Sequence, residues 1–445
     1  MQLDDLLAQA PISLPQLRRA LGAAAPVLLS SAALGSQGRF DVLPLVDGEV
    51  LVVPYPGRPG HAEALAALQA QLRSIKVGGG AAQASAAIFS GGWLLYLSYE
   101  FGAIFEPRVG AHQPELDEPL AVLWRAPAAL IEDRLTGRRR LSGQPGAELQ
   151  GVLANLLAQG AAELTPALPE LTLAEEEPQQ FLDGVARIHE YLIAGDVFQV
   201  NLSRAWRVTG AHDFDVDALY QRLCAANPAP FAGLATHAGW SLLSSSPERL
   251  VSVRGDRVET RPIAGTRRRD VDPVADAHLL AELERDPKER AEHIMLIDLE
   301  RNDLGRICVP GSIAVDELGA IESYAHVHHL VSNVSGRLRP DMDAWSLLAA
   351  VFPGGTITGC PKVRCMQIIS ELEPNARGAY TGSLGYIGDD GDVDFNILIR
   401  TLSVRGKEIV LRAGAGIVAD SIAGHELKET RNKARGMLRA LGIDG

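Results

Sequence analysis

The chain has 445 residues, of which 47% are hydrophobic, and a formal net charge of −13. This length predicts one large domain or two ordinary domains with a sizeable core. Basic runs extend to three residues at most, as at Arg267–Arg269, and the acidic balance excludes nucleic acid and anionic membranes as expected partners.

Two further features predict a cytoplasmic protein. The acidic start MQLDDLLAQA is not typical of a signal peptide, and the longest uncharged stretch, residues 77–99, contains five glycines, which argues against a membrane span. Neither a disulfide framework nor a zinc pattern is formed by the four cysteines, Cys224, Cys308, Cys360 and Cys365.

Residues 1–160 form a first sequence region. The segment RFDVLPLVDGEVLVVPYPG predicts strand, turn and strand, and RRRLSGQPGAELQGVLANLLAQGAAEL predicts a strand end followed by a helix. A connection is expected around Pro166, Pro169 and the acidic run Glu175–Glu177.

Residues 179–445 form a second sequence region, with a different pattern of predicted elements. FLDGVARIHEYLIAG predicts an amphipathic helix ending at Gly195, DVFQVNLSRAWRV predicts a strand, and WSLLSSSPERLVSVRGDRVETRPIAGT predicts two strands around Gly255 and Asp256. Because hairpins and long helices follow in no strict alternation, the pattern indicates an α+β fold.

One predicted helix carries a pair of glutamates at its start. In RDPKERAEHIMLIDLERNDLGRI, Asp286 is a predicted cap and Pro287 suits the first helical position. The apolar run Ile294–Ile297 predicts a helix buried on most sides. Glu289 and Glu292 lie at its entrance, where a carboxylate must be paired or bind a cation. A cap with a salt bridge is the simpler interpretation of this pair alone.

A second pair lies in HELKETRNK, near the C-terminus. Glu426, Glu429 and Lys433 fall within about 60° of one helix face. Taken alone, they fit a solvated charged stripe. Two such helices change the interpretation, because four converging carboxylates repel one another without a cation. Oxygen ligands without suitably spaced His or Cys favour Mg²⁺.

Two glycine-rich segments suit an anion. FPGGTITGCPKVRCMQIISELE predicts a loop that opens a helix, where backbone N–H groups hold negative charge. RAGAGIVADS follows a strand with Gly414 and Gly416. Their spacing resembles a dinucleotide fingerprint, but no βαβ unit follows. Glycines that let the backbone approach a carboxylate are the better interpretation.

A predicted hairpin brings two polar residues together. RGAYTGSLGYIGDDGDVDFNILIRTL turns near Asp390, which places Tyr380 opposite Arg400. The fork of an arginine suits a carboxylate. A strand-end salt bridge is an equally simple role for Arg400.

Eight segments together resemble the motif series of the chorismate-utilising enzymes, in order: RPIAGT, DLERNDLGR, VHHLVSNV, FPGGTITGCPK, YTGSLGY, ILIRT, GAGIVADS and ETRNK. The resemblance covers about residues 180–440 and, more weakly, residues 25–130. It implies an α+β fold of two packed antiparallel β-sheets with peripheral helices, as in anthranilate synthase. It also implies that residues 1–160 interleave in one body with a catalytic region, residues 179–445.

The resemblance further implies site residues. Mg²⁺ is expected on Glu292 and Glu429, supported by Glu289 and Glu426. The positions that match contacts to substrate carboxylates are Tyr380, Arg400, Gly414, Ala415, Gly416 and Lys433. Thr356 and His329 match residues beside the substrate ring, and Glu248 matches the general acid that helps the C4 hydroxyl leave.

The attacking nucleophile is expected to be ammonia. Branches of the family that add water carry a lysine base where this chain has Gln199, and a neutral amide cannot deprotonate water. None of the four cysteines lies in a Gly-x-Cys-x-Gly elbow. A separate glutamine amidotransferase is therefore the expected ammonia source.

The sequence cues for the ring position that is aminated, C4 or C2, conflict. QVNLS, SPERL, ETRPI, GGTITG and GRFDVL favour amination at C4, which leads to para-aminobenzoate and folate. Ala264 argues the other way, because some C4 enzymes carry a lysine nucleophile there and alanine cannot form a covalent adduct. Anthranilate synthesis, by C2 amination and loss of pyruvate, is the alternative. It is weakened because Leu28–Ser31 reads Leu-Leu-Ser-Ser, where tryptophan-controlled enzymes have Leu-Leu-Glu-Ser.

A third interpretation is a non-catalytic sensor protein that keeps only the chorismate-binding pocket. Such a protein would not need the carboxyl of Glu248. We therefore expect an enzyme, and the five segments named above favour C4 amination of chorismate.

Overall fold

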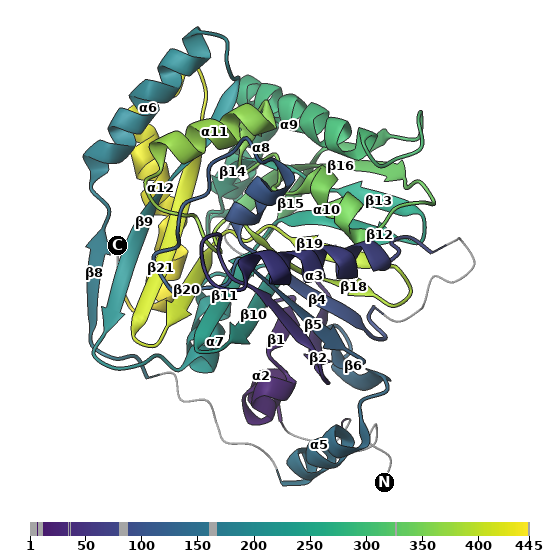
Figure 1. The fold of residues 1–445 in the computed structure, drawn as a ribbon. Coiled ribbons are helices and arrows are strands. Elements are labelled where there is room, and N and C mark those ends of the chain that lie inside the picture. The colour runs from purple at the N-terminus through teal and green to yellow at the C-terminus, as the bar shows by residue number, and fades with distance from the viewer. Residues whose placement is uncertain are drawn as a thin grey trace.

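A computed structural model describes Leu7 and residues 12–33, 35, 37–79, 88–159, 167–324 and 327–443. Two antiparallel sheets form its body, with helices around them (Figure 1). In spatial order, the first sheet contains β17 (Gly359–Cys360), β9 (Gln199–Gly210), β21 (Glu408–Ile417), β20 (Thr401–Arg405), β11 (Trp240–Ser246), β10 (Phe231–His237), β1 (Val27–Ser30), β2 (Phe40–Leu45), β6 (Ala128–Asp133) and β7 (Arg138–Gly143), with β8 (Leu171–Glu175) beside β9.

The second sheet lies against the first. In spatial order it contains β14 (Ile263–Arg268), β16 (Val327–Arg337), β13 (Arg257–Thr260), β12 (Arg249–Arg254), β19 (Val393–Asn396), β18 (Ser383–Gly388), β4 (Gly92–Leu97), β5 (Ala121–Ala126) and β3 (Val50–Val53), with β15 (Ala314–Ser323) beside β16. Apolar side chains of both sheets, such as Val42 and Leu242 from the first and Leu94 and Val122 from the second, share one buried cluster. The predicted α+β fold of two packed antiparallel sheets is thus confirmed.

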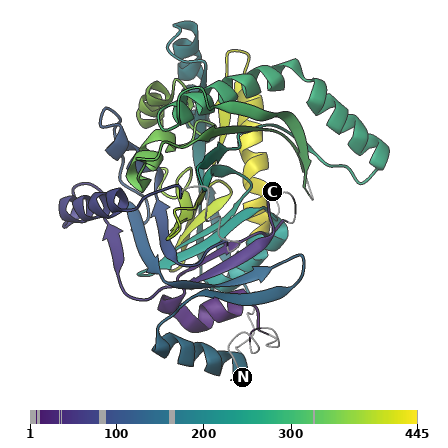
Figure 2. The ribbon, with the colours of Figure 1, turned by 90° about the vertical axis from the view of Figure 1, so that its right-hand side faces the viewer.

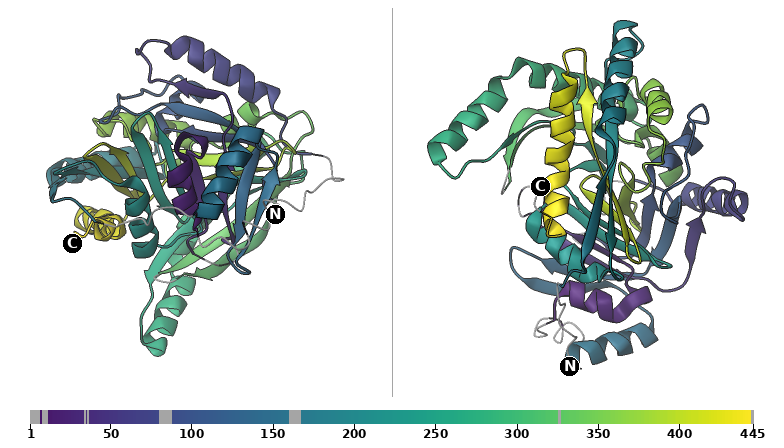
Figure 3. Two further views of the ribbon diagram at one scale, coloured as in Figure 1. Left: turned by 90° about the horizontal axis from the view of Figure 1, so that it is seen from below. Right: turned by 90° about the vertical axis from the view of Figure 1, so that its left-hand side faces the viewer.

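Helices surround the sheets (Figures 1 and 3). They are α2 (Leu14–Leu21), α3 (His61–Ser74), α4 (Gly102–Phe105), α5 (Ala147–Gln159), α6 (Pro178–Ile193), α7 (Val216–Ala226), α8 (Pro273–Arg285), α9 (Pro287–Gly305), α10 (Ala344–Val351), α11 (Lys362–Leu372) and α12 (Ala423–Ala440), with short 3₁₀ turns at Gly22–Ala24 and Tyr99–Phe101. Helix α12 packs on β21 between α6 and α7, and α9 packs on β14 and β16. Within the described residues, none of the helices combines the length and the apolar composition that crossing a membrane requires.

Strands from the first 143 residues enter both sheets. β1 pairs with β10 in the first sheet, and β4 pairs with β18 in the second. The two strands predicted around Asp47 and Gly48 exist as β2 and β3, but they do not pair with each other. β2 joins β6 in the first sheet, and β3 joins β5 in the second. The intervening turn therefore connects the two layers of the fold.

Helix α9 begins at Pro287, as predicted. The prediction that it is buried on most sides is wrong for one face. Leu296 and Ile297 are buried, whereas the side chain of Ile294 is 56% exposed. One face of the helix packs on β14 and β16 and the opposite face is left open, as the outer position of α8 and α9 in Figure 2 illustrates.

Candidate active site

The pairing of β9 with β21 builds one wall of the site. Gly414 lies opposite Ser203, Ala415 opposite Leu202, and Gly416 opposite Asn201. A Cβ atom on Gly416 would lie 2.4 Å from Nε2 of Gln199. On Gly414 it would lie 2.7 Å from Oδ1 of Asn201 and 2.8 Å from the Tyr380 hydroxyl. Polar side chains therefore lie directly over this strand, and a side chain at either glycine would displace them.

Two of these polar side chains have an unused acceptor. Oε1 of Gln199 and Oδ1 of Asn201 are buried and have no hydrogen-bond partner within the described part of the chain. Both residues are less than 10% exposed. A buried acceptor without a partner is costly, so this wall is suited to a ligand that supplies donors.

Tyr380 and Arg400 flank the hairpin of β18 and β19. The register Gly385 to Phe395 centres the turn on Asp390, which confirms the predicted hairpin. Beyond the strands, the N–H of Leu398 donates to the carbonyl of Gly382 at 2.9 Å and continues this alignment toward Tyr380 and Arg400.

Arg400 adopts a left-handed backbone with φ of 53°, which is uncommon for arginine. Burial lowers the pKa of Arg400, against the attraction of Glu248. No ion pair of Arg400 occurs among the described residues. A desolvated guanidinium in a strained backbone position is suited to a bound anion.

Lys433 approaches the same glycine strand from α12. Its Nζ donates to the carbonyl oxygen of Gly414 at 3.1 Å and pairs with Glu429 at 2.7 Å. Desolvation alone would lower the pKa of Lys433, but the charge and hydrogen bond of Glu429 outweigh it and the pKa is raised. The side chain is therefore a cation at the edge of the site.

Glu248 is a buried carboxyl between β11 and β12, 5% exposed. Burial raises the pKa of Glu248 to about 7, while the Thr356 hydroxyl, the Ile263 amide, Lys433 and Arg400 oppose the rise. A carboxyl that is partly protonated near neutrality is matched to general acid catalysis.

His329 on β16 is also buried. Burial, with the charges of Arg400 and Lys433, lowers the pKa of His329 to about 3, so the imidazole is neutral. Nδ1 lies 2.9 Å from the Thr266 hydroxyl, and Nε2 is buried without a hydrogen-bond partner among the described residues. The structure thus brings Glu248, His329, Thr356, Arg400 and Lys433 into one neighbourhood.

The four glutamates proposed for Mg²⁺ are not gathered in this arrangement. Glu289 accepts a hydrogen bond from Arg267 at 2.8 Å, and Glu429 is paired with Lys433. Glu292 is partly buried on α9, and Glu426 is buried in the first turn of α12. In the described residues, no three acidic, histidine or cysteine side chains are placed to hold a metal ion.

The donor chemistry nevertheless fits Mg²⁺, since the candidate ligands are all carboxylates. Glu289 also lies close to strand β14, because a Cβ on Gly265 of that strand would lie 3.0 Å from its Oε2. Binding the ion would require Glu289 and Glu429 to exchange their present cationic partners for the metal.

Two polar residues of this neighbourhood were missed from the sequence. Asn201 stands two positions after Gln199 on the same strand, so strand periodicity places both on one face. Glu300 of α9 is 6% exposed, and burial with the nearby charges of Asp303 and Glu248 raises the pKa of Glu300. Its signal was spacing, because Glu300 stands three positions after Ile297 and four before Leu304, which places it on the same helix face as these apolar residues.

Comparison with known proteins places these residues in a family. A family described as chorismate binding enzyme matches residues 51–439. Aminodeoxychorismate synthase component 1 of Bacillus subtilis (strain 168) is 42% identical over 373 residues, covering 80% of this chain and 78% of that protein. Anthranilate synthase component 1 of Synechocystis sp. is 40% identical over 392 residues, covering 79% and 76%.

A solved structure gives the same result for the fold. Anthranilate synthase component I from Streptococcus pneumoniae TIGR4 superimposes with a TM-score of 0.76 at 28% identity, covering 91% of this chain and 93% of that one. The chain therefore belongs to the chorismate binding enzyme family.

Proposed function

We propose that this protein aminates chorismate at C4 to give 4-amino-4-deoxychorismate, with Mg²⁺ as cofactor and with ammonia from a separate glutamine amidotransferase. The observation that carries the proposal is the grouping of a carboxyl poised to be an acid, Glu248, with two cations, Arg400 and Lys433. Gln199, in place of a base, favours ammonia over water as the nucleophile.

In this proposal the charged and the neutral side chains have different roles. Arg400, Lys433 and the Tyr380 hydroxyl hold the carboxylates of chorismate over the Gly414–Gly416 backbone. Neutral His329 and Thr356 lie beside the ring and orient it. When bound by the four glutamates, Mg²⁺ would fix and neutralise a substrate carboxylate.

Glu248 moves the proton. Its carboxyl donates to the C4 hydroxyl, the C4–O bond breaks, and water leaves. The nitrogen of ammonia forms the new C–N bond and carries a surplus proton. The carboxylate of Glu248 takes that proton back, so the residue ends the cycle as it began.

Amination at C2 with loss of pyruvate is the second candidate, and Ala264 favours it. This residue is buried on β14 opposite Leu330 and has no amine for a covalent adduct. The sequence identities to aminodeoxychorismate and anthranilate synthases are also similar, 42% and 40%.

A nitrogen-source experiment tests the enzyme proposal. The purified chain is incubated with chorismate and Mg²⁺, with either ammonium or glutamine. We expect chorismate to be consumed with ammonium and not with glutamine, because the chain has no glutaminase nucleophile elbow. Consumption with glutamine alone would contradict the separate amidotransferase, and no consumption with either would contradict the proposed reaction.

A further inference from the structure

A single guanidinium connects three segments that carry site residues. Arg377 belongs to the loop that ends at Tyr380. Its Nη1 donates to the carbonyl of Ile357 at 2.9 Å, and its Nη2 donates to the carbonyl of Asn201 at 2.7 Å. Ile357 follows Thr356 in the glycine-rich loop, and Asn201 lies on β9 two residues from Gln199.

Glu373, at the end of α11, fixes that guanidinium. Its Oε1 accepts from Nη2 of Arg377 at 2.7 Å, and its Oε2 accepts from Nε of Arg377 at 3.0 Å. The same carboxylate accepts from Arg412 at 2.9 Å and from the N–H and hydroxyl of Ser203 at 2.9 and 3.0 Å. Glu373 is 3% exposed, and a buried carboxylate with this many donors is held in one orientation.

The cluster also supports the Tyr380 ring. The guanidinium carbon of Arg377 lies 5.6 Å from the ring centre of Tyr380 and 4.7 Å from that of Tyr99. The backbone N–H of Tyr380 donates to the carbonyl of Arg377 at 3.1 Å. Both the main chain and the ring of Tyr380 are therefore tied to Arg377.

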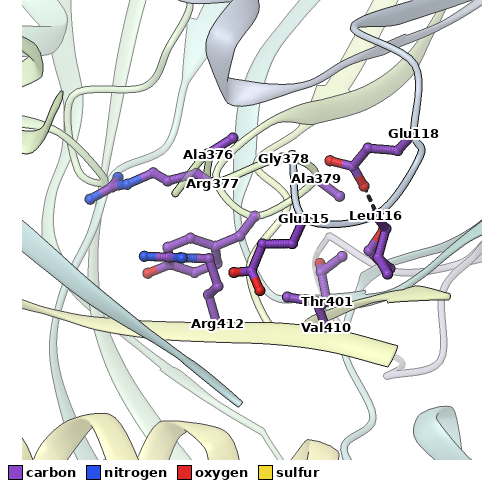
Figure 4. A pocket seen from close by; sticks show the side chains of 12 residues that line it. Glu115, Leu116, Glu118, Ala376, Arg377, Gly378, Ala379, Thr401, Val410 and Arg412 are labelled. Carbon is purple, nitrogen blue, oxygen red and sulfur yellow. Dashed lines mark hydrogen bonds between the residues drawn. The ribbon is translucent and has the colours of Figure 1, made fainter. Parts of the chain in front are cut away.

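A small cavity adjoins the cluster of Glu373, Arg377 and Arg412. It measures about 20 Å³ and is lined by Arg377, Tyr380, Arg412 and Glu118, among others (Figure 4). This volume suits one water molecule and not an organic ligand. Within the protein, the charges of Arg377 and Arg412 are both met by the carboxylate of Glu373, at 2.7 and 2.9 Å.

We propose that Arg377 and Glu373 are positioning residues, which set Tyr380, Thr356 and Gln199 relative to one another for the bound substrate. This inference rests on the proposed function, because the substrate roles of these three residues do. Lysine cannot replace Arg377, since an ammonium has three donors at one point whereas the planar guanidinium has five that diverge.

A double-mutant cycle tests the inference. Arg377→Lys and Tyr380→Phe are made singly and together, and the KM for chorismate is measured with ammonium as nitrogen source. We expect each single change to raise the KM about tenfold, and the double change to raise it by clearly less than the product of the two. Arg405→Lys is the matched control, because Arg405 is partly exposed and its side chain, among the residues that the structure describes, bonds only to Asp117 and Ala238 in loops. It should leave the KM unchanged.

The inference is overturned if the rise in KM of the double variant equals the product of the two single rises. It is also overturned if Arg377→Lys leaves the KM unchanged. If Arg377→Lys does not fold, Glu373→Gln takes its place in the cycle with the same expectation. Calorimetric titration of chorismate into each variant separates this test from the proposed reaction. A wild-type chain that binds chorismate but does not consume it would contradict the reaction alone, and the cycle in binding affinity would still decide the role of Arg377.

Discussion

The ammonium of Lys433 donates a hydrogen bond to the carbonyl oxygen of Gly414 at 3.1 Å and pairs with Glu429 at 2.7 Å. One side chain thus joins the glycine strand to a glutamate proposed for the metal. If Glu429 turned to Mg²⁺ as proposed, a substrate carboxylate would take its place as the charge partner of Lys433.

Replacing Lys433 by methionine should weaken chorismate binding. The change removes a cation from a carboxylate site, so we expect the KM for chorismate to rise about tenfold or more. Steady-state kinetics with ammonium measures this. Lys428→Met, an exposed position on the same helix, is the matched control. Equal KM values for the two variants would contradict the role of Lys433.

Replacing Gly414 by alanine should displace Tyr380 and Asn201. The added methyl would lie 2.8 Å from the Tyr380 hydroxyl and 2.8 Å from the backbone oxygen of Leu202, which cannot move as a side chain can. We expect loss of chorismate binding in a titration and a fall of roughly 1–3 kcal/mol in the free energy of unfolding. Gly424→Ala, where a Cβ meets nothing within 4 Å, should change neither.

Replacing Glu248 by glutamine should lower kcat by about 10²–10⁴-fold with little change in substrate affinity, because it removes the proton donor and keeps the side-chain size. Glu408→Gln, an exposed position, should have no effect. A variant that retains wild-type kcat would exclude Glu248 as the acid.

The same change should alter the pH dependence of stability. The folded pKa of Glu248 is about 7, above its ordinary 4.5, mainly because of burial. The proton is therefore held more tightly in the folded state. As the pH rises from 4.5 through 7, the unfolded state ionises first, and the folded protein loses up to about 3 kcal/mol. The groups facing this carboxyl, Arg400, Lys433 and Glu300, are unchanged in Glu248→Gln.

Urea unfolding at pH 5 and pH 8 measures that effect. We expect the stability of the wild type, relative to Glu248→Gln, to be lower at pH 8 than at pH 5. A constant difference between the two proteins would show that Glu248 does not have a raised pKa in the folded state.

Removing the metal should stop the reaction. We expect EDTA to abolish chorismate consumption and Mg²⁺ to restore it, and Glu429→Gln to raise the Mg²⁺ concentration needed for half-maximal rate. Calorimetric titration of Mg²⁺ in the presence of chorismate gives a readout independent of turnover. Asp298→Asn, on the exposed side of α9, is the control. Full activity in EDTA would contradict the proposed cofactor.

Local signals predicted much of this fold. Proline and cap residues fixed the start of α9, and the turn at Asp390 fixed the register that directs Tyr380 and Arg400. These features depend on residues close together in the chain. The period of an apolar run could not tell which face of α9 stays open at Ile294, because that depends on what packs against it.

Contacts between segments far apart in the chain could not be predicted from the sequence. Glu373 meets Ser203 across 170 positions and Arg412 across 39, and neither Glu373 nor the arginines have a local pattern that marks them. The assignment of β2 and β3 to different sheets is of the same kind, since a turn sequence does not say whether its two strands pair.

The identity of the product tests the central claim most directly. The chain is incubated with chorismate, Mg²⁺ and excess ammonium at alkaline pH, and the product is identified by mass and fluorescence. We predict 4-amino-4-deoxychorismate, which retains the enolpyruvyl group, and no pyruvate. Anthranilate together with an equal amount of pyruvate would contradict amination at C4 and would support the C2 reaction instead.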